Sequence, residues 1–484
     1  MPIATSPPDD SHFDLICVGS GFANTFFLVD YLRRAGPQAR VLVLERGRHN
    51  SHDWQLENRR NSNIDWKDTY IRQGDPGKDW RFTIGFGGGS NCWFGQTPRM
   101  MPSDFRMKSL YGVGEDWPVS YDDLEPFYQE AEEIMMISGP SDDSPVRRSK
   151  PYPQPPHRFH GADRLLKQAY PDHHFAMPTV RARVETKNRP PCCSNGVCHL
   201  CPVDAKFTIQ NEMMGLFEDP RVVLLMEAEV LAVETRGDVA AGVRYRFQGR
   251  EYLAEGDLVV LGANALFNPF ILLRSDIRHP RLGRRLSEAA SLWGEVFLNG
   301  VDCFDGSTVT TGLNYAAYEG PHRRERGAFT IETWNHGPLR VAYGKWRSVL
   351  HIYITIEDLP LEQNRVELSS EDPSRPVAIF EGHSPYLHRG VEAVKTEVSR
   401  IMAPLPVEKV VFRDELGRNG GHIQGTAMMG DDPETSVVDR HLIHHRLRNL
   451  LVLGASAFPT GPCANPTLTL CALSLWSARH VMTS

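Results

Sequence analysis

Residues 13–45 read FDLICVGSGFANTFFLVDYLRRAGPQARVLVLE and contain the pattern that decides the fold of this 484-residue chain. A short apolar run from Leu15 to Val18 precedes Gly19-Ser20-Gly21, and a second apolar run, Val41 to Leu44, ends in Glu45. The residues between the glycines and the second run have the spacing of an amphipathic helix. This order of strand, glycine turn, helix and strand predicts a βαβ unit of a parallel sheet.

The residue types in this unit favour binding of a dinucleotide over a bare structural turn. Gly19 would make the tight turn, and Gly21 would let the backbone approach a pyrophosphate at the helix N-terminus. Glu45 would accept a hydrogen bond from a ribose hydroxyl. Asn24 departs from the pattern, because a third glycine or an alanine usually allows close packing of helix on strand at that position.

Composition excludes several classes of function. The chain has 53 Lys and Arg against 60 Asp and Glu, a net charge of -7, with 41% hydrophobic and 23% charged residues. These fractions are those of an ordinary globular protein, and the length suits two or three domains or one large α/β domain with insertions. The acidic balance argues against nucleic-acid binding and against a polybasic membrane anchor. No apolar run is long enough for a membrane helix, and residues 1–12 lack a signal-peptide pattern and suggest a disordered tail.

Other segments of the sequence predict further helices, strands and loops, and one further glycine-rich loop suited to a ligand. The stretch Phe82–Gly95, FTIGFGGGSNCWFG, is flanked by large apolar groups and suits close approach of the backbone to a ligand better than a flexible surface loop. We expect an amphipathic helix over Pro118–Ile137, then a surface loop over Ser138–Pro156. Leu258–Leu261 is expected to be a strand close to the nucleotide, and Leu350–Ile356 a strand of a second, sheet-based domain.

Motifs spread along the chain resemble the glucose–methanol–choline (GMC) family of flavin oxidoreductases. They include EDLPLEQNRVELS at 357–369, GHIQGTAMMG at 421–430, NLLVLGASAFPT at 449–460 and NPTLTL at 465–470. Within the family, residues 98–132 are most similar to the flavoprotein subunits of bacterial dehydrogenases that oxidise fructose, gluconate, glucose or related polyols.

The resemblance implies an α/β fold (α+β overall), in which a doubly wound FAD-binding domain is interleaved with an antiparallel-sheet substrate domain. We expect residues 12–290 and 410–484 to form the discontinuous FAD-binding domain, including a cysteine-rich segment at 188–206. Residues 291–409 would form the substrate domain, with contributions from about 50–180.

By the same resemblance, sixteen residues are expected to contact FAD: Gly19, Gly21, Phe22, Ala23, Glu45, Arg46, Gly88, Gly89, Ser90, Asn91, Val230, Gly454, Ala455, Asn465, Pro466 and Thr467. In some relatives a histidine near the second glycine-rich loop is covalently attached to FAD. Here Cys92 stands at that place, so we expect noncovalent FAD, with a thioether to Cys92 as the alternative.

The resemblance assigns His422 as the catalytic base and Asn465 as the second group on the substrate oxygen. A histidine suits the first role, because its ordinary pKa near 6.5 leaves it neutral and basic at about pH 7. Asn465 and Pro466 also read as the N-cap and first residue of a helix over Thr467–Val481. That helix N-terminus could stabilise an anionic reduced flavin.

Four of the nine cysteines lie within ten residues: Cys192, Cys193, Cys198 and Cys201, the last followed by Pro202. Thiolates at short spacing closed by Cys-Pro suit an iron–sulfur cluster. The similar dehydrogenase subunits hold a three-iron (3Fe–4S) cluster in such a segment, although here the spacing between Cys198 and Cys201 is one residue shorter. A structural disulfide, free thiols or zinc are the alternatives.

The sequence therefore predicts FAD-dependent oxidation of an alcohol group of a sugar, sugar acid or polyol. Electrons would pass through the cluster to a partner, such as a small subunit with a cytochrome c or a quinone-linked acceptor. The alternatives are an oxygen-using oxidase, a flavin-containing lyase and a non-enzymatic flavin protein. Residues 292–404 show no pattern that identifies the substrate. The location is left open between the cytoplasm and a periplasmic or membrane-associated site reached by co-export with a partner.

Overall fold

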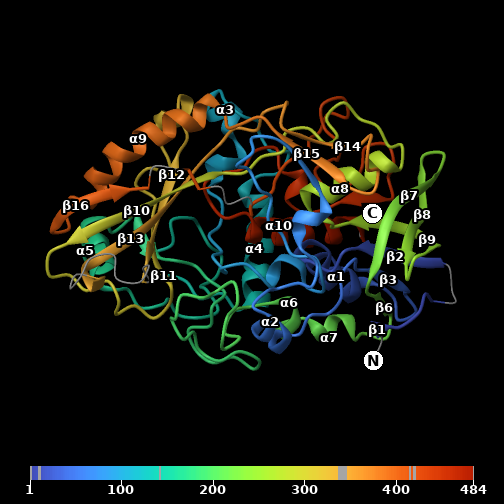
Figure 1. Cartoon of the computed structure of the whole chain (residues 1–484), viewed down its shortest axis with the longest axis horizontal. Coiled ribbons are helices and arrows are strands. Elements are labelled where there is room, and N and C mark those ends of the chain that lie inside the picture. The colour runs from blue at the N-terminus through green and yellow to red at the C-terminus, as the bar shows by residue number, and fades with distance from the viewer. Residues whose placement is uncertain are drawn as a thin grey trace.

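The computed structural model describes residues 3–8, 12–140, 143–335, 346–413, 416–417 and 421–482. Two large sheets lie toward opposite ends of an elongated molecule, with helices α1 (Phe22–Arg34), α4 (Tyr121–Met135) and α10 (Thr467–Val481) between them (Figure 1). A functional site shared by both sheets can therefore lie only near the middle of the molecule.

The first sheet is doubly wound, as predicted. Its parallel strands are β2 (His12–Val18), β3 (Val41–Leu44), β6 (Val222–Leu225), β9 (Arg250–Leu261) and β17 (Leu450–Val452), in the spatial order β6-β3-β2-β9-β17. The chain moves from β2 outward through β3 and β6 and then returns to the other side of β2. The order therefore reverses between β2 and β9, which is where open α/β sheets bind their ligands.

The sheet is extended at both sides. β7 (Ala228–Arg236) and β8 (Val239–Phe247) form an antiparallel meander with the first half of β9. On the other side, β1 (Ile3–Ala4) pairs with the end of β6. The prediction of a disordered tail is wrong for these two residues, because the edge of β6 offers them backbone partners, and for His12, which begins β2. Residues 1, 2 and 9–11 of the predicted tail lie outside the described chain.

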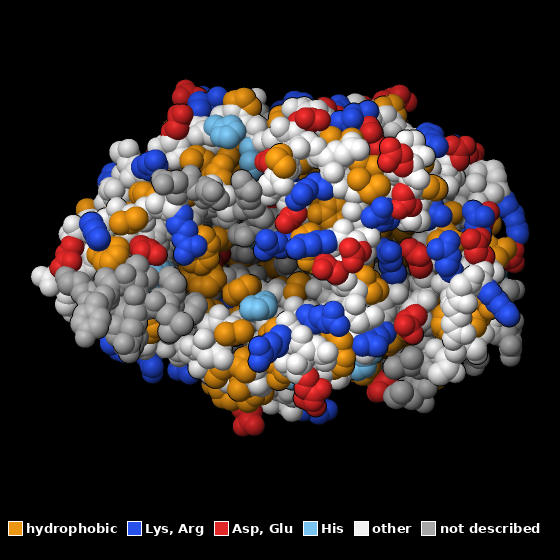
Figure 2. Space-filling view, in the orientation of Figure 1, with side chains coloured by type: hydrophobic (Ala, Val, Ile, Leu, Met, Phe, Trp, Pro, Cys, Tyr) orange, Lys and Arg blue, Asp and Glu red, His pale blue; other side chains and the backbone are white. Residues whose placement is uncertain are grey.

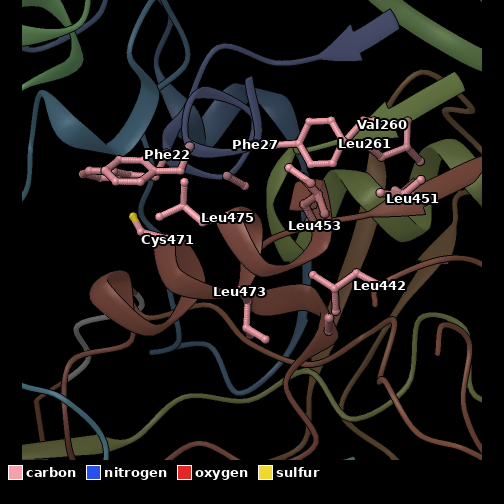
Figure 3. Close-up of a cluster of buried hydrophobic side chains, with 14 of the residues drawn as sticks. Phe22, Phe27, Val260, Leu261, Leu442, Leu451, Leu453, Cys471, Leu473 and Leu475 are labelled. Atoms are coloured by element: carbon pink, nitrogen blue, oxygen red, sulfur yellow. The ribbon is translucent and has the colours of Figure 1, made fainter. Parts of the chain in front are cut away.

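Helix α10 is the central element of the largest core. Figure 3 shows Cys471, Leu473 and Leu475 on this helix among side chains of α1 and of the parallel strands. Its predicted range, Thr467–Val481, is confirmed. α4 also lies within its predicted range; it begins at Tyr121 because Ser120 and Asp123 form a capping box before it.

The missing third glycine of the nucleotide motif is compensated from the neighbouring strand. Asn24 Nδ2 donates hydrogen bonds to the Val18 and Gly19 carbonyl oxygens, at 2.7 and 2.8 Å. A Cβ added at Gly262, directly after β9, would lie 2.6 Å from the Asn24 side chain. The space that a glycine at position 24 would leave is thus provided by Gly262, and helix, β2 and β9 stay in close contact.

The second sheet is antiparallel throughout and has the order β16-β10-β13-β12-β11-β5. Its strands are β5 (His174–Ala176), β10 (Ala290–Leu298), β11 (Thr310–Asn314), β12 (Phe329–Trp334), β13 (Val349–Ile356) and β16 (Val407–Phe412). The predicted strand at Leu350–Ile356 is therefore confirmed, and β5 shows that the sheet takes residues from well before position 290. The proposed domain limits stay a prediction.

The two faces of this sheet differ because side chains alternate along each strand. One face carries aliphatic residues such as Leu292, Val296, Ile352 and Ile354, which pack with helices α5 (Gly161–Ala169) and α9 (Pro385–Met402) in a second core. The other face carries the residues between them and points toward the first sheet. This second face is therefore available to a ligand.

Smaller elements connect the two layers. They are α2 (His52–Asn58), α3 (Met107–Tyr111), α6 (Ile209–Glu212), α7 (Met214–Phe217), α8 (Asn264–Arg274) and a three-stranded sheet of β14 (Arg365–Leu368), β15 (Pro376–Phe380) and β4 (Ile71–Gly74). Within the described ranges, no helix combines the length and apolar character needed to cross a bilayer.

The contact between Asn24 and Gly262 gives a first prediction. Gly262→Ala should destabilise the protein by about 1–3 kcal/mol, because the new methyl group overlaps the buried Asn24 amide. Urea unfolding followed by circular dichroism measures this loss. In the double variant with Asn24→Gly, the combined loss should be smaller than the sum of the two single losses. Additive losses would show that the two positions do not compete for space.

Candidate active site

A cavity of about 1030 Å³ lies between the two sheets. It opens at the carboxyl ends of β2 and β9 and is lined by both glycine-rich turns and by the inner face of the second sheet. The volume is at the upper end of the ~300–1,000 Å³ usual for small-molecule sites. Figure 2 shows one side of the whole molecule. Its surface is hollowed near the middle, with hydrophobic side chains in the hollow and Lys or Arg side chains around it.

One end of the cavity is suited to a phosphate group. Gly21 is the N-cap of α1, and neither a side-chain cap nor an acidic residue occupies the first turn of that helix. A Cβ added at Gly21 would meet no protein atom within 4 Å, whereas one at Gly88 would lie 3.3 Å from the Gly21 Cα. The N-terminus of α1 therefore has room for an anion without a competing side chain, and the loop at Gly88 covers it closely.

The acidic residue at the end of β3 is held in place by the same turn. Glu45 accepts hydrogen bonds from Ser20 N and Oγ, at 3.0 and 2.8 Å, and from Gly47 N at 2.9 Å. It is buried and lines the cavity. Arg46 lines the cavity beside it, with its guanidinium 5.2 Å from the centre of the Phe267 ring.

Most of the residues predicted to contact FAD line this one cavity. They are Gly19, Gly21, Phe22, Ala23, Glu45, Arg46, Gly88, Gly89, Val230, Gly454, Ala455, Asn465, Pro466 and Thr467. Ser90 and Asn91 do not line it. Their side chains bond within the loop instead, from Ser90 Oγ to the Gly87 carbonyl oxygen at 2.7 Å and from Asn91 Nδ2 to that of Phe86 at 2.9 Å. Cys92 does line the cavity.

The two residues assigned to catalysis lie together on the cavity wall. His422 Nε2 and Asn465 Nδ2 are 3.5 Å apart, although the residues are 43 positions apart in sequence. The prediction that Asn465 caps α10 is wrong, since Pro466 is the N-cap residue and no side chain caps the helix. The Asn465 amide is therefore directed toward His422, and the first-turn amides of α10 stay open at the cavity.

The surroundings of His422 keep its imidazole neutral. Burial lowers its pKa to about 4, and the nearby Lys78 cation acts in the same direction. Lys78 is itself 4% exposed and forms an ion pair with Glu288, another residue of the cavity wall. A neutral imidazole with a free Nε2 lone pair can accept a proton from a ligand hydroxyl.

The inner face of the second sheet supplies residues that the sequence analysis missed. Ser291, Trp293, Glu332, Trp334, Tyr353 and Thr355 all line the cavity, and so does Glu288, just before β10. Alternation along Leu350–Ile356 was a usable signal, because every second residue there is aliphatic. Which of the two faces would meet a ligand was not readable from the strands alone.

The four clustered cysteines do not converge as metal ligands in this structure. Cys193 is exposed, Cys198 is buried against Val309 and Trp334, and Cys192 Sγ lies 3.5 Å from Thr308 Oγ1. In the described part of the chain, no three His, Cys, Asp or Glu side chains are placed to hold a metal ion, and all nine cysteines are free thiols. The arrangement thus fits neither a zinc site nor a disulfide, and as it stands it does not present a ligand set for a cluster.

The segment nevertheless adjoins the cavity. Buried Lys206 donates hydrogen bonds from Nζ to the carbonyl oxygens of Asn91, Trp93 and Cys198, at 3.0, 2.9 and 2.9 Å. This one cation ties the cysteine segment to the glycine-rich loop that carries Cys92. His199, next to Cys198, lines the cavity directly.

The fold and the site define a dinucleotide-binding α/β protein whose second sheet covers the ligand cavity. Residues 360–474 match the family model of GMC oxidoreductases, so this part of the chain is the C-terminal domain of that family. Solved structures agree in fold: a pyridoxine 4-oxidase from Mesorbium loti superposes with a TM-score of 0.69 at 18% identity and covers 98% of this chain and 99% of its own. The resemblance stated from the sequence is confirmed.

Relatives include both dehydrogenases and oxidases. The large subunit of fructose dehydrogenase from Gluconobacter japonicus is 26% identical over 82% of this chain and 80% of its own length. The gluconate 2-dehydrogenase flavoprotein of Pantoea cypripedii is 25% identical over 82% and 78%. Paromamine 6'-oxidase of Streptomyces fradiae is 26% identical over 98% and 92%.

The open space at Gly21 gives a second prediction. Gly21→Asp should abolish binding of the dinucleotide, because its carboxylate would repel a pyrophosphate at the helix N-terminus, while the added Cβ meets no protein atom within 4 Å. The ratio of flavin to protein absorbance of the purified variant measures this. Gly36→Asp, in equally open space beyond the other end of α1, is the matched control and should keep its flavin. Full flavin content in Gly21→Asp would contradict the assignment.

Proposed function

We propose that this protein is an FAD-dependent dehydrogenase that oxidises an alcohol group of a sugar, sugar acid or polyol and delivers the electrons to a partner acceptor. The observation that carries the proposal is the His422–Asn465 pair, 3.5 Å apart, on the wall of a cavity that also contains the dinucleotide motif. The dehydrogenases among the relatives support the substrate class.

The fourteen cavity-lining residues predicted for FAD fit a bound dinucleotide. Glycine turns would hold the pyrophosphate, Glu45 would meet the ribose, and the open N-terminus of α10 would favour negative charge on the ring system. We propose noncovalent binding, with Cys92 as the alternative attachment point. When bound, FAD would supply the acceptor for the hydride that leaves the substrate carbon.

Two side chains, those of His422 and Asn465, would act on the hydroxyl group of the substrate. His422 Nε2, neutral in this environment, would take the hydroxyl proton of the substrate, while Asn465 Nδ2 would donate a hydrogen bond to the same oxygen. As negative charge develops on that oxygen, the hydrogen bond that Asn465 Nδ2 donates to it would become stronger. In this proposal His422 is therefore the base, and Asn465 is the hydrogen-bond donor that stabilises the developing anion.

Two features support a protein or quinone-linked acceptor. The relative from Gluconobacter is named a large subunit. In addition, the cysteine segment contacts the cavity wall and carries two exposed apolar side chains, Val197 and Val203, with exposed fractions of 41% and 38%. An iron–sulfur cluster in this segment stays a prediction from the sequence.

An oxygen-using oxidase is the second candidate. It is favoured by the extent of the similarity, since paromamine 6'-oxidase aligns over 98% of this chain and fructose dehydrogenase over 82%. The distinguishing measurement compares peroxide formation in air with anaerobic turnover on an artificial acceptor.

A third prediction concerns the base. His422→Ala should slow flavin reduction by substrate about 10²–10⁴-fold, as expected for removal of a general base. Stopped-flow bleaching of the flavin is the measurement, and His445→Ala, whose imidazole bonds Ser436 outside the cavity, is the control. Because the base must be neutral, kcat/KM of the wild type should hold steady above about pH 5 and fall as the pH drops through about 4. An acid limb near pH 6.5 that persists in His422→Ala would argue against this role.

A fourth prediction concerns the cysteine segment. The double variant Cys192→Ser/Cys193→Ser should keep normal flavin reduction by substrate, because neither side chain lines the cavity. Loss of turnover with the partner acceptor would support the cluster predicted from the sequence, whereas unchanged turnover would contradict it. Iron and acid-labile sulfide assays with EPR spectra on anaerobically purified protein test the cluster itself. An iron-free wild type that oxidises sugars and forms peroxide in air would favour the oxidase.

A further inference from the structure

Three side chains on the inner face of the second sheet form one row across neighbouring strands. Trp293 on β10 pairs with Tyr353 on β13, and Tyr353 pairs with Glu332 on β12. Directly opposed residues of antiparallel strands have their Cβ atoms about 4.5–5.5 Å apart and point to the same face. All three line the cavity, so a carboxyl group and two aromatic rings meet a ligand side by side.

Two more rings complete the surroundings of this row. Trp334, two residues after Glu332, lies with its ring centre 4.9 Å from that of Trp293 at an angle of 66°. Phe94 lies 5.7 Å from Trp334, and Tyr353 lies 4.8 Å from Trp293 at 61°. The rings are inclined to one another rather than stacked in parallel, so ring faces and edges together form the wall of a pocket.

Glu332 has no cationic partner in the described part of the chain. It is 2% exposed, and its carboxyl group accepts a hydrogen bond from Gln96 Nε2 at 3.3 Å. Burial raises its pKa to about 7, although Trp334, Arg181 and Gln96 each act to lower it. Buried carboxylates are normally paired, because an isolated charge loses its hydration without compensation.

Two arginine side chains of this region contact groups other than the Glu332 carboxyl group. The Arg181 guanidinium donates to Thr308 Oγ1 at 2.7 Å and to the Phe94 carbonyl oxygen at 2.6 Å, with a further contact to Thr310. Arg413 lies on the exposed side, with its guanidinium 5.8 Å from the centre of the Trp293 ring. Neither forms an ion pair with Glu332, so among the described residues this cavity-lining carboxyl group has no counter-charge.

We propose that Glu332 and the rings of Phe94, Trp293, Trp334 and Tyr353 form a subsite for a protonated amino group, and that the preferred substrate is an amino sugar or amino alcohol. This inference rests on the proposed oxidation of an alcohol group and specifies which alcohols are selected. A cation would pair with the buried carboxylate and meet the electron-rich faces of the rings. A neutral hydroxyl would gain a hydrogen bond only.

The test compares matched pairs that differ by one amino group, glucose with glucosamine and galactose with galactosamine, on the holoenzyme. Wild-type kcat/KM should favour the amino member of at least one pair by about tenfold or more. Glu332→Gln should remove that preference by raising KM for the amino sugar more than KM for the neutral sugar. Glu295→Gln, on β10 of the same sheet but outside the cavity lining, is the matched control and should keep the preference.

A binding measurement separates failure of this inference from failure of the proposed function. Tetramethylammonium should bind the holoenzyme in calorimetry, and Glu332→Gln should weaken it at least tenfold, whether or not any sugar bleaches the flavin. If no alcohol bleaches the flavin but the cation binds through Glu332, the proposed function fails and the subsite stands. If neutral and amino sugars are used equally and tetramethylammonium binds equally to wild type and Glu332→Gln, the subsite is overturned.

Discussion

The close approach of backbone to backbone at the ends of β2 and β9 is the constraint on which the rest of the structure depends. A Cβ at Gly19 would lie 3.1 Å from the Gly262 carbonyl oxygen, and the first turn of α1 is bonded to the same place through Asn24. Only small residues permit this contact. Because it is so tight, the helix N-terminus, both glycine turns and the last residues of β9 all face one cavity.

The second sheet depends on a simpler rule, the alternation of side chains along a strand. Its aliphatic face is covered by α5 and α9, so the other face must meet either solvent or the first sheet. It meets the cavity. In the function proposed above, its carboxyl and aromatic groups would select the ligand, while the first sheet would hold the cofactor.

Elements with a strong local pattern were predictable. The βαβ unit, the helix Thr467–Val481 and the strand around Leu350–Ile356 depend on periodicity and on short-range signals, and they lie where the sequence placed them. Predictions that depended on finer contacts were wrong. Asn465 does not cap α10, because Pro466 takes that position and the amide turns to His422. Ile3 and Ala4 are ordered by pairing with β6, a partner more than 200 positions away.

By itself the sequence determined the class of the protein: its glycine turns admit a dinucleotide, and its ordered motifs are those of GMC oxidoreductases. Such features are local, since each needs particular residues at fixed spacing. Only the tertiary structure decided which distant residues share the cavity. His422 meets Asn465, Lys78 meets Glu288, and Glu332 is left among four aromatic rings without a counter-ion in the described chain. These relations depend on strand register and on the face that each strand presents, because a shift of one residue would exchange the two faces of the sheet.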